Sequence, residues 1–99
     1  MSTYVFNFLQ EFTYTILEVK KVYIPTLDAQ LVGCVLADFR KHKGVTQEVL
    51  SGLADIGRTH LSAIERGERK PTLETLYRIS MALDVKMSDI VIEIERRLS

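Results

Sequence analysis

Side chains that can donate hydrogen bonds to a phosphate or to a base edge gather in one stretch of this 99-residue chain. They are Gln47, Arg58, Thr59, His60, Ser62, Arg66, Arg69 and Lys70. Arginine matters most, because its planar guanidinium can bind a phosphate or bridge two acceptors of a guanine. Between residues 40 and 70, seven basic residues oppose four acidic ones, a net charge of +3 in a chain whose formal net charge is zero. This distribution favours a face directed at phosphates, with ordinary solvated surface charges as the alternative.

The reactive side chains do not form a pattern typical of an enzyme. His42 and His60 are separated by a helical pattern, and neither has a cysteine or carboxylate at metal-ligand spacing. The chain has no glycine-rich phosphate loop. Its single cysteine, Cys34, lies in a helical pattern without a neighbouring activating cation, so we expect a small core residue. We therefore expect no catalytic residue, no metal and no cofactor.

Two short helices joined by a turn must position the donors. Thr46 can cap the first helix, whose apolar positions at helical spacing are Val49, Leu50 and Leu53. The pattern breaks at residues 54–57, and a second helix is expected over about residues 58–66, ending before Gly67. Helix, tight turn, helix is the geometry that places a second helix in the DNA major groove.

Three more helices are expected around this pair. The first begins after Thr26 or Asp28 and ends near His42; its inward positions are Leu31, Val35, Leu36 and Phe39. The next is capped by Thr72 and closed by Asp84. Its core candidates are Leu73, Leu76, Ile79, Met81, Ala82 and Leu83. The last runs over about residues 87–98, with Met87, Ile90, Val91, Ile94 and Leu98 at helical spacing and Ile92 beyond that stripe.

The sequence resembles the helix-turn-helix domain of the lambda-repressor-like family, also called the XRE or Cro type. The match runs from about residue 31 to residue 90 and includes Arg58–Thr59; its most specific segments are Thr46–Glu48, Ile64–Gly67 and Lys70–Leu76. Four positions depart from the family pattern: Ala37 replaces a frequent Arg, Ser51 an alanine, Asp55 a turn glycine and Gly57 a Ser/Thr cap. The resemblance implies an all-α fold, a five-helix DNA-binding domain over residues 26–99.

The resemblance also implies a role for each candidate site residue. Base edges would be read by Arg58, Thr59, Ser62 and Ala63. The DNA backbone would be contacted by Gln47, His60, Arg66, Arg69 and Lys70. An internal ion pair would join Arg40 and Glu65. For His60, Arg69 and Lys70, a plain solvated surface residue is the alternative.

Residues 1–25 form an N-terminal arm of a different composition, rich in aromatic and β-branched residues. The alternation from Phe12 to Ile16 favours a short β-ribbon. The alternative is a helix whose apolar side would carry Phe8, Leu9, Phe12, Ile16 and Leu17. Since a two-stranded ribbon is marginal alone, the arm must pack on the helical domain or on a second subunit.

These observations predict a sequence-specific regulator of transcription that binds double-stranded DNA as a homodimer on an inverted repeat. The dimer would be built by the last helix, the arm, or both. The alternative is a protein-interaction module of the same fold, antitoxin-like or part of a complex, that uses the apolar arm. A single cysteine and the lack of a membrane-spanning run or signal-peptide pattern predict a cytoplasmic protein without a membrane partner.

Overall fold

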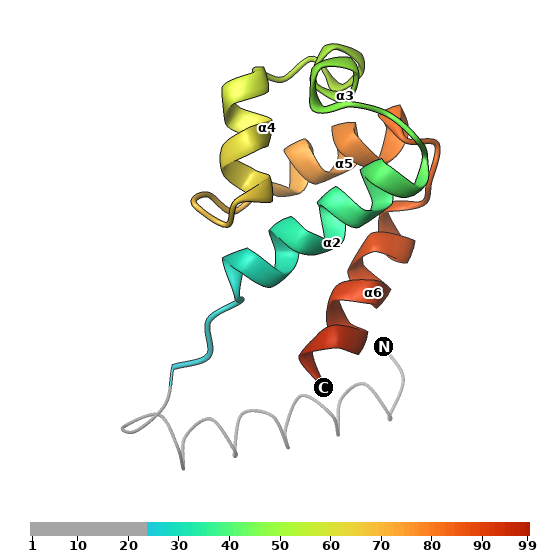
Figure 1. The fold of residues 1–99 in the computed structure, drawn as a ribbon. Helices are drawn as coiled ribbons and strands as arrows, with labels where there is room; N and C mark the ends of the chain where they lie inside the picture. The colour runs from blue at the N-terminus through green and yellow to red at the C-terminus, as the bar shows by residue number, and fades with distance from the viewer. Residues whose placement is uncertain (1–23) are drawn as a thin grey trace.

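A computed structural model describes residues 24–99, which form five α-helices and no strand (Figure 1). The helices are α2 (Ala29–His42), α3 (Gln47–Ala54), α4 (Arg58–Glu65), α5 (Leu73–Ala82) and α6 (Met87–Leu98). The expected all-α, five-helix fold is therefore confirmed. The expected β-ribbon of the N-terminal arm falls on residues 1–23, outside the described residues.

Short polar side chains fix where three of these helices begin. The carboxylate of Asp28, rather than Thr26, caps α2 by accepting from the backbone N–H groups of Gln30 and Leu31. The Thr46 hydroxyl does the same for Val49 in α3. Thr72 caps α5 in the same way. Each such cap stabilises its helix by roughly 1 kcal/mol.

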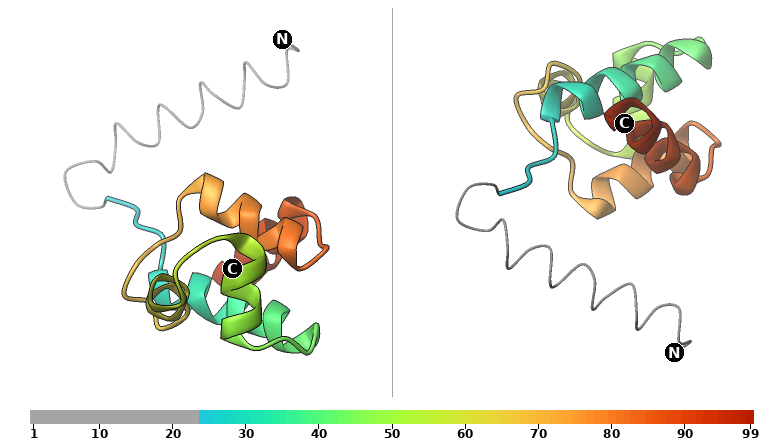
Figure 2. Two further views of the ribbon diagram at one scale, coloured as in Figure 1. Left: turned by 90° about the horizontal axis from the view of Figure 1, so that it is seen from above. Right: turned by 90° about the horizontal axis from the view of Figure 1, so that it is seen from below.

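The core lies where α2 meets the other helices. α2 packs against α4 and α6, while α3 packs against α5, and Figures 1 and 2 show α3 and α4 at the end of the domain opposite α6. Gly33 permits the approach of α2 to α4, because a Cβ there would collide with the carbonyl oxygens of Ile64 and Glu65. The fully or nearly fully buried apolar residues of this core are Val32, Val35, Leu36, Leu50, Ala54, Leu61, Ile64, Leu76, Ile79, Leu83, Ile90 and Ile94.

Ionic contacts add to this packing between α2 and α6. Arg97 Nη2 lies 2.9 Å from Asp38 Oδ2, and Arg97 Nε lies 2.7 Å from Glu93 Oε2. Hydrogen bonds from Arg96 and Arg97 lower the pKa of Glu93 to about 2. The carboxylate of Glu93 therefore stays ionised below the usual glutamate range, which favours its bonds to Arg96 and Arg97 within α6.

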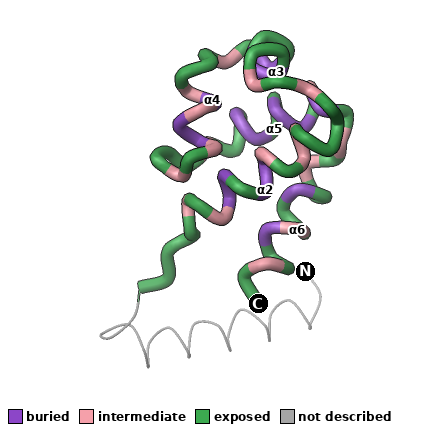
Figure 3. Tube along the Cα trace, viewed as in Figure 1, coloured by how far each residue is buried: buried purple, intermediate pink, exposed green. Residues whose placement is uncertain are grey.

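Several apolar positions expected in the core lie at the surface (Figure 3). They are Val49, Leu53, Leu73, Val91, Met81 and Leu98. The helix α3 has only eight residues, and it is held to the core by Leu50, Ser51 and Ala54. Leu53 instead faces a shallow groove, open to solvent, that it lines with Tyr77 and Met81 of α5. The spacing located the helices correctly but assigned part of the inward face wrongly.

Cys34 is also at the surface, where the sequence predicted a core position. It follows Gly33, which takes the inward place on α2 against α4. In the described part of the chain, residues 24–99, no helix combines the length and hydropathy needed to cross a membrane.

Candidate nucleic-acid interface

The turn between α3 and α4 presents the first turn of α4 to solvent. Asp55 ends α3 with a left-handed backbone, at φ 54° and ψ 48°, which Asp tolerates better than most non-glycine residues. The N–H of Ile56 then donates to the carbonyl of Ser51, at 3.0 Å, and closes the turn. Gly57 is the N-cap of α4 and supplies no side-chain hydrogen bond, as its type implies. The first backbone N–H groups of α4 therefore lack a side-chain cap.

A shallow polar concavity lies beside this turn. It is lined by Gln47, Arg58, Thr59, Ser62 and Arg66, which come from α3 and from one face of α4 and its C-cap. Arg58 and Thr59 are exposed, and Ser62 is half-buried one turn further along. The fold thus brings together three of the four expected base readers and two of the five expected backbone contacts.

Ala63, the fourth expected base reader, does not face this concavity. Its side chain is only 8% exposed and lies on the inner face of α4 with Leu61 and Ile64. The expectation for Ala63 was wrong. Each residue of α4 is rotated by about 100° from the one before it, so Ser62 faces the concavity and Ala63 faces the core. His60 is half-buried and does not line the concavity.

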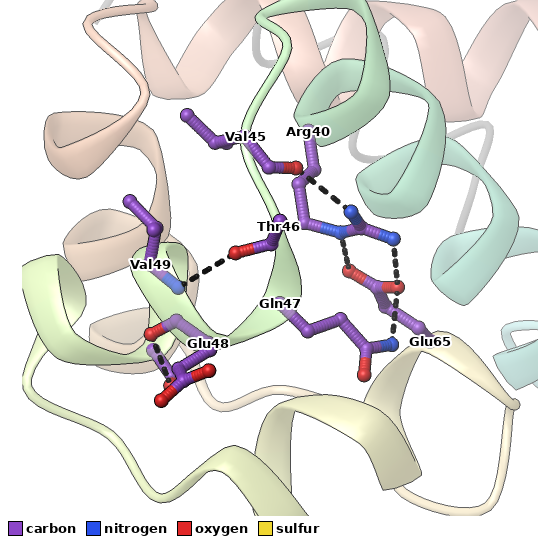
Figure 4. A network of polar contacts seen from close by, with 8 residues as sticks. Arg40, Val45, Thr46, Gln47, Glu48, Val49 and Glu65 are labelled. Atoms are coloured by element: carbon purple, nitrogen blue, oxygen red, sulfur yellow. Dashed lines mark hydrogen bonds and ion pairs between the residues drawn. The ribbon is translucent and has the colours of Figure 1, made fainter.

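A buried polar network supports the concavity from behind (Figure 4). Arg40 of α2 and Glu65 of α4 form a bidentate ion pair. Arg40 Nε lies 2.7 Å from Glu65 Oε2, and Arg40 Nη2 lies 3.0 Å from Glu65 Oε1. Arg40 Nη1 also donates to the carbonyl of Val45, at 2.9 Å. The side chains of Arg40 and Glu65 are only 11% and 5% exposed. Three hydrogen bonds to the protein thus compensate the buried guanidinium.

Gln47 connects this network to the concavity. Its Nε2 donates to Glu65 Oε1 at 2.8 Å, so one amide N–H expected at a DNA phosphate is used inside the protein. Figure 4 shows the amide oxygen of Gln47 turned away from the ion pair. Because α2, α3 and α4 all contribute to these bonds, the network fixes the first residue of α3 relative to the reading face of α4.

A second ion pair lies at the same, C-terminal end of α4, but in solvent. Arg66 Nε lies 2.7 Å from Glu68 Oε2, and Arg66 Nη2 lies 3.0 Å from Glu68 Oε1. Arg66 Nη1 donates to the hydroxyl of Ser62. The hydrogen bond with Glu68, and then its charge, raise the pKa of Arg66; the hydrogen bond from Arg66 lowers the pKa of Glu68. Sequence reasoning missed Glu68, although an acid two residues after an expected DNA-binding arginine was visible.

The remaining cations are free of such partners. Arg58, Arg69 and Lys70 are exposed, and within residues 24–99 none of them forms an ion pair. Arg69 and Lys70 follow α4 in the loop to α5 and do not line the concavity. Among the same described residues, no three His, Cys, Asp or Glu side chains are grouped so as to hold a metal ion.

Comparison with known proteins agrees with this geometry. A family model described as helix-turn-helix matches residues 36–90. An uncharacterised HTH-type transcriptional regulator of Sinorhizobium fredii, y4dJ, is 40% identical over 62 residues, which are 63% of this chain and 80% of that protein.

Two solved structures show the same fold with appreciable sequence identity. The clp gene regulator ClgR from C. glutamicum superposes with a TM-score of 0.69 at 30% identity, over 77% of this chain and 97% of that one. The restriction-modification controller protein C.AhdI from Aeromonas hydrophila gives a TM-score of 0.62 at 29% identity, over 66% of this chain and 98% of that one. Since the family match spans more than half of the sequence, this chain belongs to the helix-turn-helix family of the lambda-repressor-like, or XRE, type.

Proposed function

We propose that this protein is a transcriptional regulator that binds a specific double-stranded DNA sequence with α4 in the major groove. The observation that carries the proposal is the polar concavity, in which the first turn of α4 exposes Arg58 and Thr59 beside Ser62 and Gln47. An α-helix that presents its N-terminal turn to base edges is the reading element of helix-turn-helix proteins. The related proteins are named as regulators of transcription, of clp genes and of restriction-modification systems, which supports a regulatory role.

The polar residues in and around this concavity divide into residues that would read bases and residues that would contact the DNA backbone. Arg58 is exposed and forms no ion pair with any of residues 24–99, so its guanidinium can bridge O6 and N7 of a guanine. Thr59 offers a hydroxyl and a methyl group, the latter suited to thymine. Arg69, Lys70 and His60 would contact the phosphates on either side, which fixes register without reading sequence.

We further propose that the protein acts as a homodimer on an inverted repeat, with the two α4 helices about one DNA turn, ~34 Å, apart. Support comes from α6, where Val91, Ile92 and Leu98 are exposed outside the buried contacts of Ile90 and Ile94. A cytoplasmic location, with access to DNA, belongs to the same proposal. Light scattering that shows a monomer at micromolar concentration would count against the dimer.

A protein-interaction module of the same fold is the second candidate. The observation that favours it is the apolar groove between α3 and α5, lined by exposed Leu53, Tyr77 and Met81. Monomeric proteins rarely expose large contiguous apolar patches, and such patches often mark sites of protein–protein interaction. In that case the concavity beside α4 would have no role in affinity for DNA.

Selection of bound sequences from a random duplex pool separates the two candidates. The regulator should enrich a short inverted repeat and bind it at least a hundredfold more tightly than a scrambled duplex in gel shifts at physiological salt, a modest ratio for such proteins. The Arg58→Ala variant, which changes an exposed side chain, should lose most of that discrimination. Failure of the wild-type protein to enrich any sequence would refute the proposal and favour the interaction module.

A further inference from the structure

The loop between α4 and α5 carries four charged side chains, and Glu68 is the only acidic one. The other three are Arg66, Arg69 and Lys70. The Glu68 carboxylate meets Arg66 with both oxygens, at 2.7 and 3.0 Å, and the two side chains are 58% and 53% exposed. Arg66 lines the polar concavity, so the carboxylate stands at the edge of the surface proposed to meet DNA. No role for Glu68 follows from the helix-turn-helix geometry itself.

The contacts of Arg66 leave little of it available to a phosphate. Nε and Nη2 donate to Glu68, and Nη1 donates to the Ser62 hydroxyl, so three of the five N–H groups are used within the protein. The guanidinium lowers the pKa of Glu68, so the carboxylate is fully charged near neutral pH. The pair therefore approaches DNA with no net charge, unlike Arg58, Arg69 and Lys70.

We propose that Glu68 is a built-in counter-ion of Arg66, which removes one cation from phosphate binding and so lowers the sequence-independent affinity of the protein for DNA. The inference rests on the proposed DNA binding at this face. Each phosphate neutralised by the protein releases counterions and steepens the dependence of affinity on salt by about 0.9 logarithmic units. A neutral Arg66–Glu68 pair contributes nothing to this slope.

This effect does not require that the pair stay closed in the complex. An exposed ion pair is weak, so a nearby phosphate can draw Arg66 away from Glu68. The freed carboxylate then lies beside the phosphates and repels them, which offsets the attraction gained by Arg66. In both arrangements the phosphates meet the same local sum of charges, so we expect the Arg66–Glu68 pair to neutralise no further phosphate and to add nothing to the salt slope.

The test compares two variants with the wild-type protein on a scrambled duplex over a range of salt concentrations. Glu68→Gln should steepen the salt slope by about 0.9 units for each bound subunit and tighten binding roughly fivefold to tenfold per subunit at 0.1 M salt. The double variant Arg66→Gln/Glu68→Gln replaces one neutral pair by another and should keep the wild-type slope. If the double variant loses about 0.9 units of slope for each bound subunit, Arg66 binds a phosphate despite Glu68 and the proposal is overturned.

Two controls make the outcome specific. Glu95→Gln removes the same charge from an exposed position on α6, at the other end of the domain from α4, and should change the slope much less than Glu68→Gln. Equal effects of the two variants would reduce the role of Glu68 to overall net charge and overturn the proposal. Weaker binding of Glu68→Gln to the selected site alone would show that Glu68 holds Arg66 for base reading, which also overturns it.

A phosphocellulose column separates failure of this inference from failure of the proposed function. It measures affinity for phosphate groups without any operator sequence. Glu68→Gln should elute at higher salt than the wild-type protein and Glu95→Gln, even if no specific DNA site exists. Elution of all three at the same salt would overturn the counter-ion role, whatever the selection experiment shows.

Discussion

Two arginine–glutamate pairs at the C-terminal end of α4, Arg40–Glu65 and Arg66–Glu68, have the same geometry and different surroundings. In both, Nε lies 2.7 Å from one carboxylate oxygen and Nη2 lies 3.0 Å from the other. Arg40 and Glu65 are separated by 25 residues and nearly buried, whereas Arg66 and Glu68 are separated by two and more than half exposed. Their third contacts also differ, a backbone carbonyl at Val45 in one and a side-chain hydroxyl in the other.

The comparison shows that the geometry of an ion pair does not determine its role. A buried pair that joins two helices makes each charge depend on the other, because neither could be hydrated alone. An exposed pair between near neighbours in sequence stabilises the fold little, since water solvates both partners when they separate. Its main consequence is the local sum of charge, and here that sum lies at the surface proposed to bind phosphates.

The largest expected effect is on stability, from Glu65→Gln. The change leaves the Arg40 guanidinium nearly buried without a counter-charge, and loss of one partner from such a pair costs roughly 3–5 kcal/mol. Urea unfolding followed by circular dichroism should show a much lower midpoint. The matched control is Glu68→Gln, the same chemical change in the exposed pair, which should leave the midpoint close to that of the wild-type protein. Similar midpoints for the two variants would contradict the distinction between the pairs.

The next effect concerns Arg58, an arginine that belongs to neither pair. Arg58→Ala should weaken binding to the selected site by about 1–3 kcal/mol and relax preference at one base pair in each half-site. The loss of affinity for a scrambled duplex should be much smaller, because there Arg58 contributes only its positive charge near the phosphates and no contact with a base. Equal losses on both duplexes would mean that Arg58 is another phosphate anchor, with specificity arising from Thr59, Ser62 or DNA shape.

A smaller effect is expected for Lys70, which is exposed and without an ion-pair partner in residues 24–99. Lys70→Ala should weaken binding to the selected and scrambled duplexes alike and lower the salt slope by about 0.9 units for each bound subunit. Lys70→Ala thus calibrates the test of Arg66. Removal of this unpaired cation should lower the salt slope, whereas removal of the Arg66–Glu68 pair in the double variant should leave the slope unchanged. An unchanged slope would assign Lys70 to the solvated surface of the loop.

The sequence predicted the helices and the buried pair better than it predicted the surfaces. Capping by Thr46 and Thr72 and the breaks at Asp55 and Gly67 are local signals, and local signals fix where helices begin and end. The Arg40–Glu65 pair followed from the family resemblance. Apolar spacing cannot tell which side of a short helix finds a partner, so Leu53, Leu73 and Met81 were placed inside when they lie outside.

The candidate site could be predicted only in part, because the sequence also does not show which side of α4 is buried. Ser62 and Ala63 are adjacent, and only the packing of α4 against α2 decides which of them faces out. The N–H groups of Gln47 and Arg66 could bind a phosphate. Within the protein, however, Gln47 donates to Glu65 and Arg66 donates to Glu68. Those contacts depend on side-chain conformation, which neither composition nor periodicity contains.

The smallest expected effect is the pH dependence contributed by the exposed pair. Arg66 lowers the pKa of Glu68 in the folded protein, so the pair stabilises the fold above the ordinary carboxyl pKa. That contribution is lost as the pH falls through the lowered pKa of the folded state. In the Arg66→Gln variant, the carboxyl carbon signal of Glu68 should therefore titrate at a higher pH than in the wild-type protein.

Unfolding experiments on the same variant test the sign of this linkage. Arg66→Gln should be slightly less stable than the wild-type protein near neutral pH, and the difference should vanish in acid, once Glu68 is protonated in both proteins. Glu93, whose pKa Arg96 and Arg97 lower to about 2, has the same surroundings in both proteins, so its contribution cancels in the difference. An unchanged Glu68 titration in the variant would mean that the exposed pair does not persist in solution. Charge near the phosphates would then be set by Glu68 and Arg66 as independent groups.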